Sequence, residues 1–382
     1  MRVTERQQVD VLLSAIGNLR SGISSRNEQI SSGKRVNRPS DDPAAAERIN
    51  QFRNILRTTE RRLQTVNESV GGLDLSDGAL EQAGNTFQRA SELAVQMKSD
   101  TNTAVERRNA ALEVQQLILG LAGIANTQLN GRFIFAGNET QTEPYVLGSV
   151  TGAANPSNSG SATIAVAVGT SSALQPDGYQ IQFTSSTQFD IVNLTTNQTL
   201  STGNAYTSGA SFSFDGVDAT ISNGGGPPAT GDQFDVRVGY LYQGDGAAIN
   251  VEVGDSQTVQ TNIPGSQVFS GPKTDLFTNL QDFHQALVTN DTNGIEKAIG
   301  QFTESLSQVN NARAFLGANV NRLDTVRESL DLVSLNTQTL RSNVEDADFS
   351  KVASDLALLQ NTLQASMATL TRQFQTNLLD FL

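Results

Sequence analysis

Apolar residues recur at alternating steps of three and four over a long stretch in the first third of this chain. The series consists of Ile49, Phe52, Leu56, Thr59, Leu63, Val66, Val70, Leu73, Asp77 and Leu80, in which only Thr59 and Asp77 are polar. Steps of this kind place a narrow apolar seam along one side of a helix, which is typical of a coiled coil. The sequence therefore predicts a coiled-coil helix over 44–98, about 80 Å long.

A second series of the same kind lies near the other end of the chain. Its members are Ile299, Phe302, Leu306, Val309, Leu316, Val320, Leu323, Val326, Leu330, Val333, Leu340 and Val344. It predicts a helix over 295–344, about 75 Å long, with a local overwinding where two three-residue steps meet at Leu323. We expect the two long helices to lie antiparallel, side by side, and a shorter helix to form near 104–128.

The residues between the two series differ from them in charge. Residues 141–272 carry 1 basic and 10 acidic groups and hold all five tyrosines, whereas residues 1–140 carry 17 basic and 16 acidic groups. Residues 273–382 carry 8 basic and 13 acidic groups. The change of composition at both edges indicates an insertion between two related flanks, and its acidic residues are expected to form a solvated face.

Within the insertion, apolar and polar residues alternate in several short runs. These runs are 179–183, 189–191, 212–214 and 234–238. Alternation with a period of two predicts β-strands, and Asp215-Gly216 and Pro176-Asp177-Gly178 are typical of turns between them. We expect a small antiparallel domain, in which NGGGPP at 223–228 is a hairpin or connector.

These features together predict an α+β fold, in which the two flanks form a long antiparallel α-helical coiled-coil rod that carries an inserted antiparallel β-rich domain. Three regions are expected. Residues 1–40 with 347–382 form terminal helices, 41–140 with 273–346 form the helical rod domain, and 141–272 form the β-rich domain.

Both ends of the chain carry an apolar series of their own, and the last five residues are LLDFL. Chain ends are usually polar and frayed, so apolar terminal helices need a surface to cover them. The residues predicted to meet that surface are Leu12, Ile16, Leu19, Ile23, Ile30, Leu356, Leu359, Leu363, Leu370, Phe374, Leu378 and Phe381. Two interpretations stay open from the residues alone: the helices complete a core within the chain, or they meet other subunits and become ordered on assembly.

A turn precedes the first long helix, in the segment SSGKRVNRPSDDPAAAERI at 31–49. Asp42 before Pro43 predicts a helix start, because an Asp side chain caps free backbone N–H groups and Pro at the first helical position has no N–H to satisfy. Asp41 and Asp42 are adjacent carboxylates, but at a helix start such residues act as caps and dipole partners. We therefore predict no metal or acid–base site there.

The composition removes most catalytic chemistry. The chain has no cysteine and a single histidine, which excludes disulfides, thiolate metal sites and a histidine cluster for zinc. His284 lies beside an apolar helical face and is expected to be a surface or edge residue rather than a base. NGGGPP lacks the Lys and Ser/Thr of a phosphate-binding loop. We predict no catalytic, cofactor-binding or metal-binding residue, and no enzyme.

The charge and hydropathy also restrict the partners. A formal net charge of -13 argues against nucleic acid or an anionic membrane surface, since both attract a basic face. The N-terminal residues MRVTERQQVDVLLSAIGNLR contain no apolar stretch of the length that a cleaved signal peptide needs. No run approaches the roughly 18 apolar residues of a membrane span.

Four segments of the chain resemble the flagellin superfamily, and most closely its hook-filament junction proteins. They are ISSGKRVNRPSDDPAAAERI at 30–49, NGRFIFAGNETQTEPY at 130–145, YQGDGAAINVEVGDSQTVQTNIPGSQVF at 242–269 and LLQNTLQASMATLTRQFQTNLLDFL at 358–382. Several independent motifs therefore occur in the right order, and the similarity spans most of 1–145 and 240–382. Residues 146–239 do not contribute to it.

The resemblance implies a structural component of the extracellular bacterial flagellum. It implies export without a cleaved signal peptide, through the flagellar type III channel, after a cytosolic export chaperone has bound the C-terminal region. The subunits then polymerise as a ring between hook-associated protein 1 and the flagellin filament. The terminal helices would form the inner tube, the long helices the next shell, and the β-rich domain would lie outermost.

Two other functions compete with this reading. Flagellin itself has related helices, but the 31–49 turn, FIFAG and LLDFL are more similar to the junction proteins. An extracellular adhesin with a β-rich binding domain on a coiled-coil stalk is disfavoured, because the two strands of the stalk lie on either side of the insertion and both chain ends are apolar. Glycan binding by residues 141–272 would favour the adhesin.

Overall fold

The structure is a computed structural model, and it describes residues 2–254, 257–271 and 273–379. The chain divides into two compact units. One unit contains both chain ends, up to Thr65 and from Val326, and the other contains residues 66–325. Within the described ranges, none of the helices is long and apolar enough to cross a membrane.

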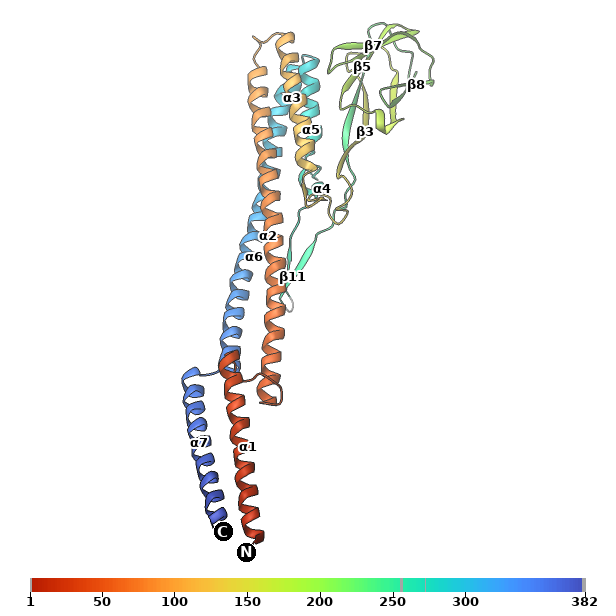
Figure 1. Cartoon of the computed structure of the whole chain (residues 1–382). Helices are drawn as coiled ribbons and strands as arrows, with labels where there is room; N and C mark the ends of the chain where they lie inside the picture. The colour runs from red at the N-terminus through yellow and green to blue at the C-terminus, as the bar shows by residue number, and fades with distance from the viewer. Residues whose placement is uncertain (1, 255–256, 272, 380–382) are drawn as a thin grey trace. The chain divides into compact units, whose positions relative to one another are not determined.

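In its described residues, the unit of the chain ends is built from helices joined by short irregular segments. It contains α1 (Arg2–Ser32) and α7 (Phe349–Leu379), together with the beginning of α2 (Pro43–Met97) and the end of α6 (Thr292–Glu345). α1 and α7 run side by side in opposite directions, as the red and dark blue helices of Figure 1 show. The predicted long helices over 44–98 and 295–344 are confirmed, with ends that differ by three residues at most.

Four helices form a bundle in the second unit. They are parts of α2 and α6, together with α3 (Ala104–Ala125) and α5 (Leu276–Val288). α2 contacts α6 through Phe87 and Phe302, and it contacts α3 through Arg89 and Glu113. α5 packs against α3 and contacts α6 through Phe283. α2 contacts both α3 and α6, and α5 also contacts both α3 and α6. These four contacts place α3 and α6 at diagonally opposite corners of the bundle.

The long helices are antiparallel in this unit, as expected. Asp77 of α2 pairs with Arg313 of α6, and Lys98 of α2 pairs with Glu296 of α6, so one residue number rises as the other falls. The shorter helix predicted near 104–128 is α3. It begins with a capping box, in which Thr103 accepts from the Glu106 N–H and the Glu106 carboxylate accepts from the Thr103 N–H.

Three details of the predicted seams are wrong. In α2 the buried position is Ser76 and not Asp77, whose carboxylate reaches outward to Arg313. In α6 the buried residues keep a spacing of seven, through Phe302, Val309, Leu316, Leu323, Leu330 and Thr337. Val333 and Leu340 are exposed, so the buried series does not shift after Leu323. The sequence analysis joined these exposed residues, which lie on a second side of α6, to the buried series. That is why it predicted two consecutive three-residue steps at Leu323.

The insertion is an antiparallel β-domain of two sheets. Its strands are β3 (Tyr145–Ala154), β4 (Thr163–Val168), β5 (Gly178–Ser185), β6 (Gln188–Asn193), β7 (Gln198–Ala205), β8 (Ser211–Phe214), β9 (Val217–Ser222) and β10 (Gln233–Tyr242). One sheet has the order β3-β10-β5-β6-β7 and the other β4-β9-β8. Outside this domain, short hairpins pair β1 (Gln128–Leu129) with β2 (Arg132–Phe133), and β11 (Asn250–Gly254) with β12 (Gln257–Gln260). A single helical turn, α4 (Gly265–Val268), follows.

The predicted strands of the insertion are confirmed, and so is the turn at Asp215-Gly216, whereas Gly178 of the other predicted turn is the first residue of β5. β10 buries alternate residues, Phe234, Val236 and Val238, in a core to which both sheets contribute. Asp215 and Gly216 form the turn between β8 and β9, where both have positive φ angles. Residues 223–228 lead from β9 to β10 and so connect one sheet to the other, as the connector prediction required.

His284 is buried, with 5% of its surface exposed, and the prediction of a surface or edge position is wrong. It lies on the side of α5 that the β-domain covers, where Gln281 donates to the Val238 carbonyl. Gln115 of α3 donates to the Pro176 carbonyl beside it. Burial lowers the pKa of His284 to about 4. The sequence of α5 could not show this, because the covering strand comes from residues about 45 positions earlier.

Candidate assembly surface

The register of α1 against α7 follows from two contacts. Arg26 pairs with Asp355 at 3.4 Å, and a methyl group of Leu359 lies 3.4 Å from the position that a Cβ on Gly22 would occupy. Residue 26 follows 22 by four positions and residue 355 precedes 359 by four, so the two contacts agree on one antiparallel register. Leu359 of the predicted set therefore lies at the seam between the two helices.

Burial along this seam is partial. Ile16 is buried, and Leu12, Leu19, Ile23, Ile30, Leu356, Leu359, Leu363 and Leu370 are half-buried. Phe381 lies outside the described residues, and so do the side chains of Phe374 and Leu378. Each described member of the set is therefore at least partly buried within one chain, and the contact of the set with other subunits stays a prediction.

Other large apolar side chains on the same two helices are exposed, and the sequence reasoning missed them. They are Val11, Leu13, Phe349, Leu358 and Met367, each with more than two-fifths of its surface accessible. They lie off the main apolar series, so a search for 3-4 spacing passes over them. A signal was present, because each is a large apolar residue that stands outside the 3-4 series of its own helix.

The end of α6 in the same unit carries a second exposed apolar group. Its members are Leu332, Val333, Leu335 and Leu340. Ile55 on α2 is also exposed. Exposed apolar residues are ordinary when scattered, whereas a concentration on a few helices is typical of an interaction surface.

A buried ion-pair cluster holds the corner where α1 leads into α2 and α6 leads into α7. The Glu345 side chain is only 4% exposed, and its carboxylate lies 2.7 Å from both Lys34 Nζ and Arg53 Nη2. The Arg35 N–H also donates to the Glu345 carbonyl. Burial by itself raises the pKa of Glu345, but the hydrogen bonds from Lys34 and Arg53 outweigh it and hold the pKa below its ordinary value.

The predicted helix start at Asp42 and Pro43 is confirmed. Asp42 Oδ1 accepts from the Ala45 N–H at 3.0 Å, and α2 begins at Pro43. This hydrogen bond and the one from Arg35 hold the pKa of Asp42 below its ordinary value. Asp41 accepts instead from the N–H groups of Asn37 and Arg38, so it closes the preceding turn. Each carboxylate therefore has a structural partner of its own.

The chemistry of the site is that of protein contact. In the described parts of the chain, no group of three or more His, Asp and Glu side chains is arranged to hold a metal ion. The terminal helices instead present apolar surface, next to a corner fixed by charge. Such an arrangement can bind another helix.

Two family models match the helical parts of the chain. The model of the bacterial flagellin N-terminal helical region matches residues 7–140, and that of the C-terminal helical region matches residues 299–382. Together they cover more than half of the chain. The chain belongs to the flagellin superfamily. A third model, the D2-like domain of flagellar hook-associated protein 1, matches residues 153–238 of this flagellin-superfamily protein, within its β-domain.

Individual relatives within the superfamily are distant. Flagellin B of Vibrio anguillarum is 25% identical over 377 residues, which cover 94% of this chain and 93% of that protein. Flagellar hook-associated protein 3 of Escherichia coli is 33% identical over 151 residues, which cover 38% of this chain and 46% of that protein. The solved structure of a flagellar hook-associated protein from Vibrio parahaemolyticus has a TM-score of 0.52 at 12% identity, and the match covers 80% of this chain and all of that one. That likeness supports the α+β fold.

Proposed function

We propose that this structural component of the bacterial flagellum is the hook-filament junction subunit, equivalent to hook-associated protein 3. It joins hook-associated protein 1 on one side to the flagellin filament on the other, as a ring of copies. The similarity to hook-associated protein 3 of Escherichia coli and the match to a domain of hook-associated protein 1 support this role. The protein acts by assembly and not by catalysis.

The observation that carries the proposal is the incomplete burial of α1 and α7. A pair of helices can cover only one side of each member, and here the outer sides keep exposed Val11 and Leu358. A helix pair with so little buried surface is marginal on its own, because ordering the chain opposes its formation. Neighbouring copies that cover the outer sides add about 1.5–3 kcal/mol for each large apolar side chain that becomes buried.

The proposed interface therefore has two parts. The described seam residues, from Leu12 to Ile30 and from Leu356 to Leu370, hold α1 and α7 together as one element. With Phe374, Leu378 and Phe381 they form the set that the sequence predicted to meet other subunits. The exposed apolar residues then meet other subunits. Before assembly the chain passes through the flagellar type III export channel, and an export chaperone covers the C-terminal region. Both steps suit terminal helices whose pairing is marginal until neighbouring copies cover them.

Deletion of residues 350–382 tests the proposal. The truncated chain is expected to keep the folded unit of residues 66–325 and to stay soluble, yet to fail to join flagella when it replaces the full chain in a motile bacterium. Tyrosine fluorescence verifies the fold, because all five tyrosines lie between residues 145 and 242. Normal incorporation of the truncated protein would contradict the proposal.

Flagellin is the second candidate function, and a specific observation favours it. The matches to flagellins extend over more than nine-tenths of this chain, whereas the match to hook-associated protein 3 covers 38%. The two roles differ in polymer length. Electron microscopy of concentrated purified protein decides between them, since a filament subunit forms long homopolymers and a junction subunit forms only short assemblies.

A further inference from the structure

Aromatic rings join the β-domain to the helices of the same unit. Tyr145 is the first residue of β3 and Tyr242 is the last of β10, and their ring centroids are 5.2 Å apart. The Tyr145 ring also contacts Phe269 and Phe277. Phe269 in turn contacts Phe135. We call these five residues the aromatic joint, and it holds both ends of the β-domain by apolar packing.

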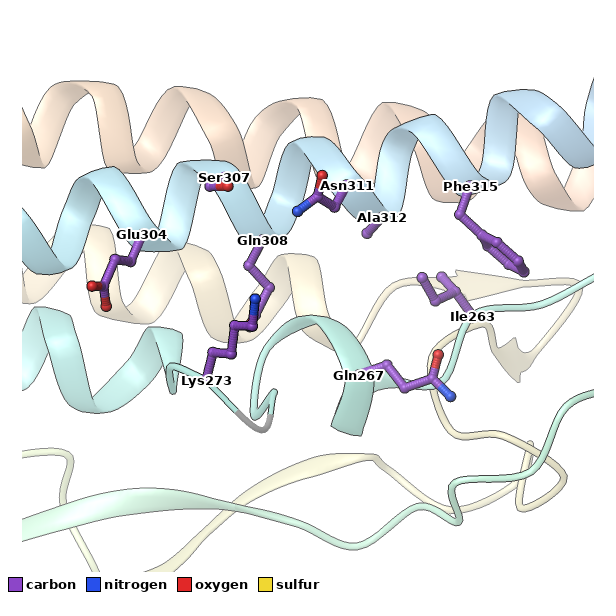
Figure 2. A pocket seen from close by; sticks show the side chains of 9 residues that line it. All are labelled: Ile263, Gln267, Lys273, Glu304, Ser307, Gln308, Asn311, Ala312 and Phe315. Carbon is purple, nitrogen blue, oxygen red and sulfur yellow. The ribbon is translucent and has the colours of Figure 1, made fainter.

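The helical side of the aromatic joint is tied to α6. Figure 2 shows the groove between α6 and the chain around α4, with Gln308 among the residues that line it. The side-chain amide of Gln308 donates to the carbonyls of Val268 and Thr274, at 2.6 and 3.1 Å. Phe269 lies between these two anchored residues in the chain. The aromatic joint therefore has a fixed base on the bundle.

A second contact between the β-domain and the bundle is polar. Gln281 of α5 donates to the Val238 carbonyl of β10 at 2.9 Å, and Gln115 of α3 donates to the Pro176 carbonyl at 2.6 Å. His284 lines the same small cavity as these four residues and is buried. We call the five residues the polar contact. Hydrogen bonds between the two parts are thus combined here with a buried group that can take up a proton.

The surroundings of His284 suit only the neutral imidazole. In the part of the chain that the structure describes, no protein group makes a hydrogen bond with Nε2. The cavity beside it has a volume of about 10 Å³, which is room for a single water molecule at most. A protonated imidazole is charged and donates from both ring nitrogens. Its charge would be buried here without a protein acceptor at Nε2 and without a hydration shell.

The charged groups around the polar contact have other partners. Asp177 and Arg237 line the cavity, and Arg237 forms an ion pair with Asp282 of α5. Asp177 and Asp235 each accept a hydrogen bond from an amide side chain within the β-domain. Of its described residues, α3 contributes only uncharged side chains to the cavity. Burial thus lowers the pKa of His284 to about 4, and opening of the polar contact would restore the ordinary value.

The two contacts therefore respond differently to acid. We propose that protonation of His284 opens the polar contact, so that the β-domain separates from α3 and α5 while the aromatic joint holds and both parts stay folded. The β-domain has a core of its own, to which both sheets contribute. Burial raises the pKa of Tyr145 and of Tyr242, and the aromatic joint stays uncharged in acid. This movement goes beyond the proposed function, since assembly as a junction subunit does not require it.

Distances between spin labels test the inference, because the natural chain contains no cysteine. One label is attached to Gln198→Cys on exposed β7 and the other to Gln88→Cys on exposed α2, in dilute full-length protein. Pulsed electron paramagnetic resonance should find one distance at pH 7 and a second population at pH 4. The equilibrium constant for separation is expected to rise about a hundredfold between these pH values, because only the separated form protonates with an ordinary pKa.

Two controls assign the change to His284 and to movement of the whole domain. His284→Gln keeps every carboxylate near the contact, and its label pair should keep one distance at both pH values. A second pair, Gln198→Cys with Ala165→Cys, joins the two sheets of the β-domain and should not change.

Three results would overturn the inference. One is an α2–β7 distance that stays the same at pH 4 with His284 in place. Another is an equal change in His284→Gln, which would assign the opening to the carboxylates. The third is a change in the pair within the β-domain, which would show that acid unfolds the domain itself.

Discussion

The two compact units of the chain use similar apolar spacing but bury it to different extents. In the unit of residues 66–325, Phe87, Phe283 and Phe302 are completely buried where three helices meet. In the unit of the chain ends, the corresponding seam of α1 and α7 is mostly half-buried, and Leu358 keeps 66% of its surface exposed. The difference lies in how many neighbours each helix has, since a pair covers one side of a helix whereas a bundle covers two.

This difference separates stability from assembly. Side chains that are buried within the chain stabilise the fold of the single molecule, whereas exposed apolar side chains can stabilise only a complex. We therefore expect substitutions in the bundle to change the free energy of unfolding of the monomer. Substitutions on the outer sides of α1 and α7 should leave it nearly unchanged.

The largest effect is expected for Phe302→Ala. Phe302 contacts the rings of Phe87 and Phe283 at centroid distances of 5.8 and 5.3 Å, so its removal leaves a cavity between three helices. Loss of a buried Phe side chain lowers the free energy of unfolding by about 3–5 kcal/mol. Urea unfolding monitored by tyrosine fluorescence measures this free energy in the unit of residues 66–325, which contains both Phe302 and all five tyrosines. The control is Phe349→Ala on exposed α7 surface, and equal losses for the two variants would contradict the comparison.

A pH-dependent effect of about 3 kcal/mol is expected from His284. Burial lowers its pKa from 6.5 to about 4, so the folded state holds the neutral imidazole while the unfolded state binds a proton below pH 6.5. Stability therefore decreases as the pH falls from 6.5 to 4, by about 1.4 kcal/mol for each unit of the shift.

The variant His284→Gln isolates this contribution, because it removes the titration and leaves the carboxylates in place. Urea unfolding at pH 7 and pH 4 should show that wild type loses about 3 kcal/mol more than the variant over this interval. If the two proteins lose the same amount, His284 binds its proton as readily in the folded state as in the unfolded state, and burial does not lower its pKa.

The helices could be predicted from the sequence because their cause is local. The 3-4 series and the Asp42-Pro43 start determine where α2 begins and which side it buries, and these signals lie within a few residues of one another. The strands of the insertion were found in the same way, through alternation and through the Asp215-Gly216 turn.

The remaining features depend on contacts between distant residues. His284 is buried by a strand whose Val238 lies 46 positions earlier, so no property of its own helix predicts it. Val333 and Leu340 belong to a plausible seam by spacing, and only the number of neighbouring helices leaves them exposed. For the same reason the sequence indicated the apolar residues at the seam of α1 and α7 but left open what covers them, and it missed Leu358 on the outer side.

An intermediate effect is expected for Glu345→Gln in the unit of the chain ends. The substitution removes the charge that Lys34 and Arg53 share, in a position where the carboxylate is almost completely buried. Loss of such charge-assisted hydrogen bonds lowers stability by about 1–3 kcal/mol. Amide hydrogen exchange at residues 33–36 should accelerate accordingly, since the Arg35 N–H donates to the backbone carbonyl of Glu345.

The control for this variant is Glu92→Gln, whose partner Arg89 forms an exposed ion pair. Exposed pairs contribute about 0–1 kcal/mol, so this change should leave hydrogen exchange at residues 33–36 as in wild type. Because the hydrogen bonds lower the pKa of Glu345, its stabilising contribution is present above the ordinary pKa of a glutamate and is lost as the pH falls through the lowered value. Exchange that is insensitive to Glu345→Gln at neutral pH would show that the corner does not depend on this cluster.

The smallest effect on the monomer, and the sharpest test of the comparison, is expected for Leu358→Gln. Its neighbour Leu359 faces Gly22 across the seam, whereas Leu358 is exposed on the outer side of α7. We expect Leu358→Gln to change monomer stability by no more than about 0.5 kcal/mol, as measured by the thermal loss of helical circular dichroism, and yet to reduce incorporation into flagella. Leu359→Gln should disturb both, because it weakens the pair before any neighbour can bind it. If Leu358→Gln left assembly intact while Leu359→Gln prevented it, the seam would be the only functional surface of the terminal helices.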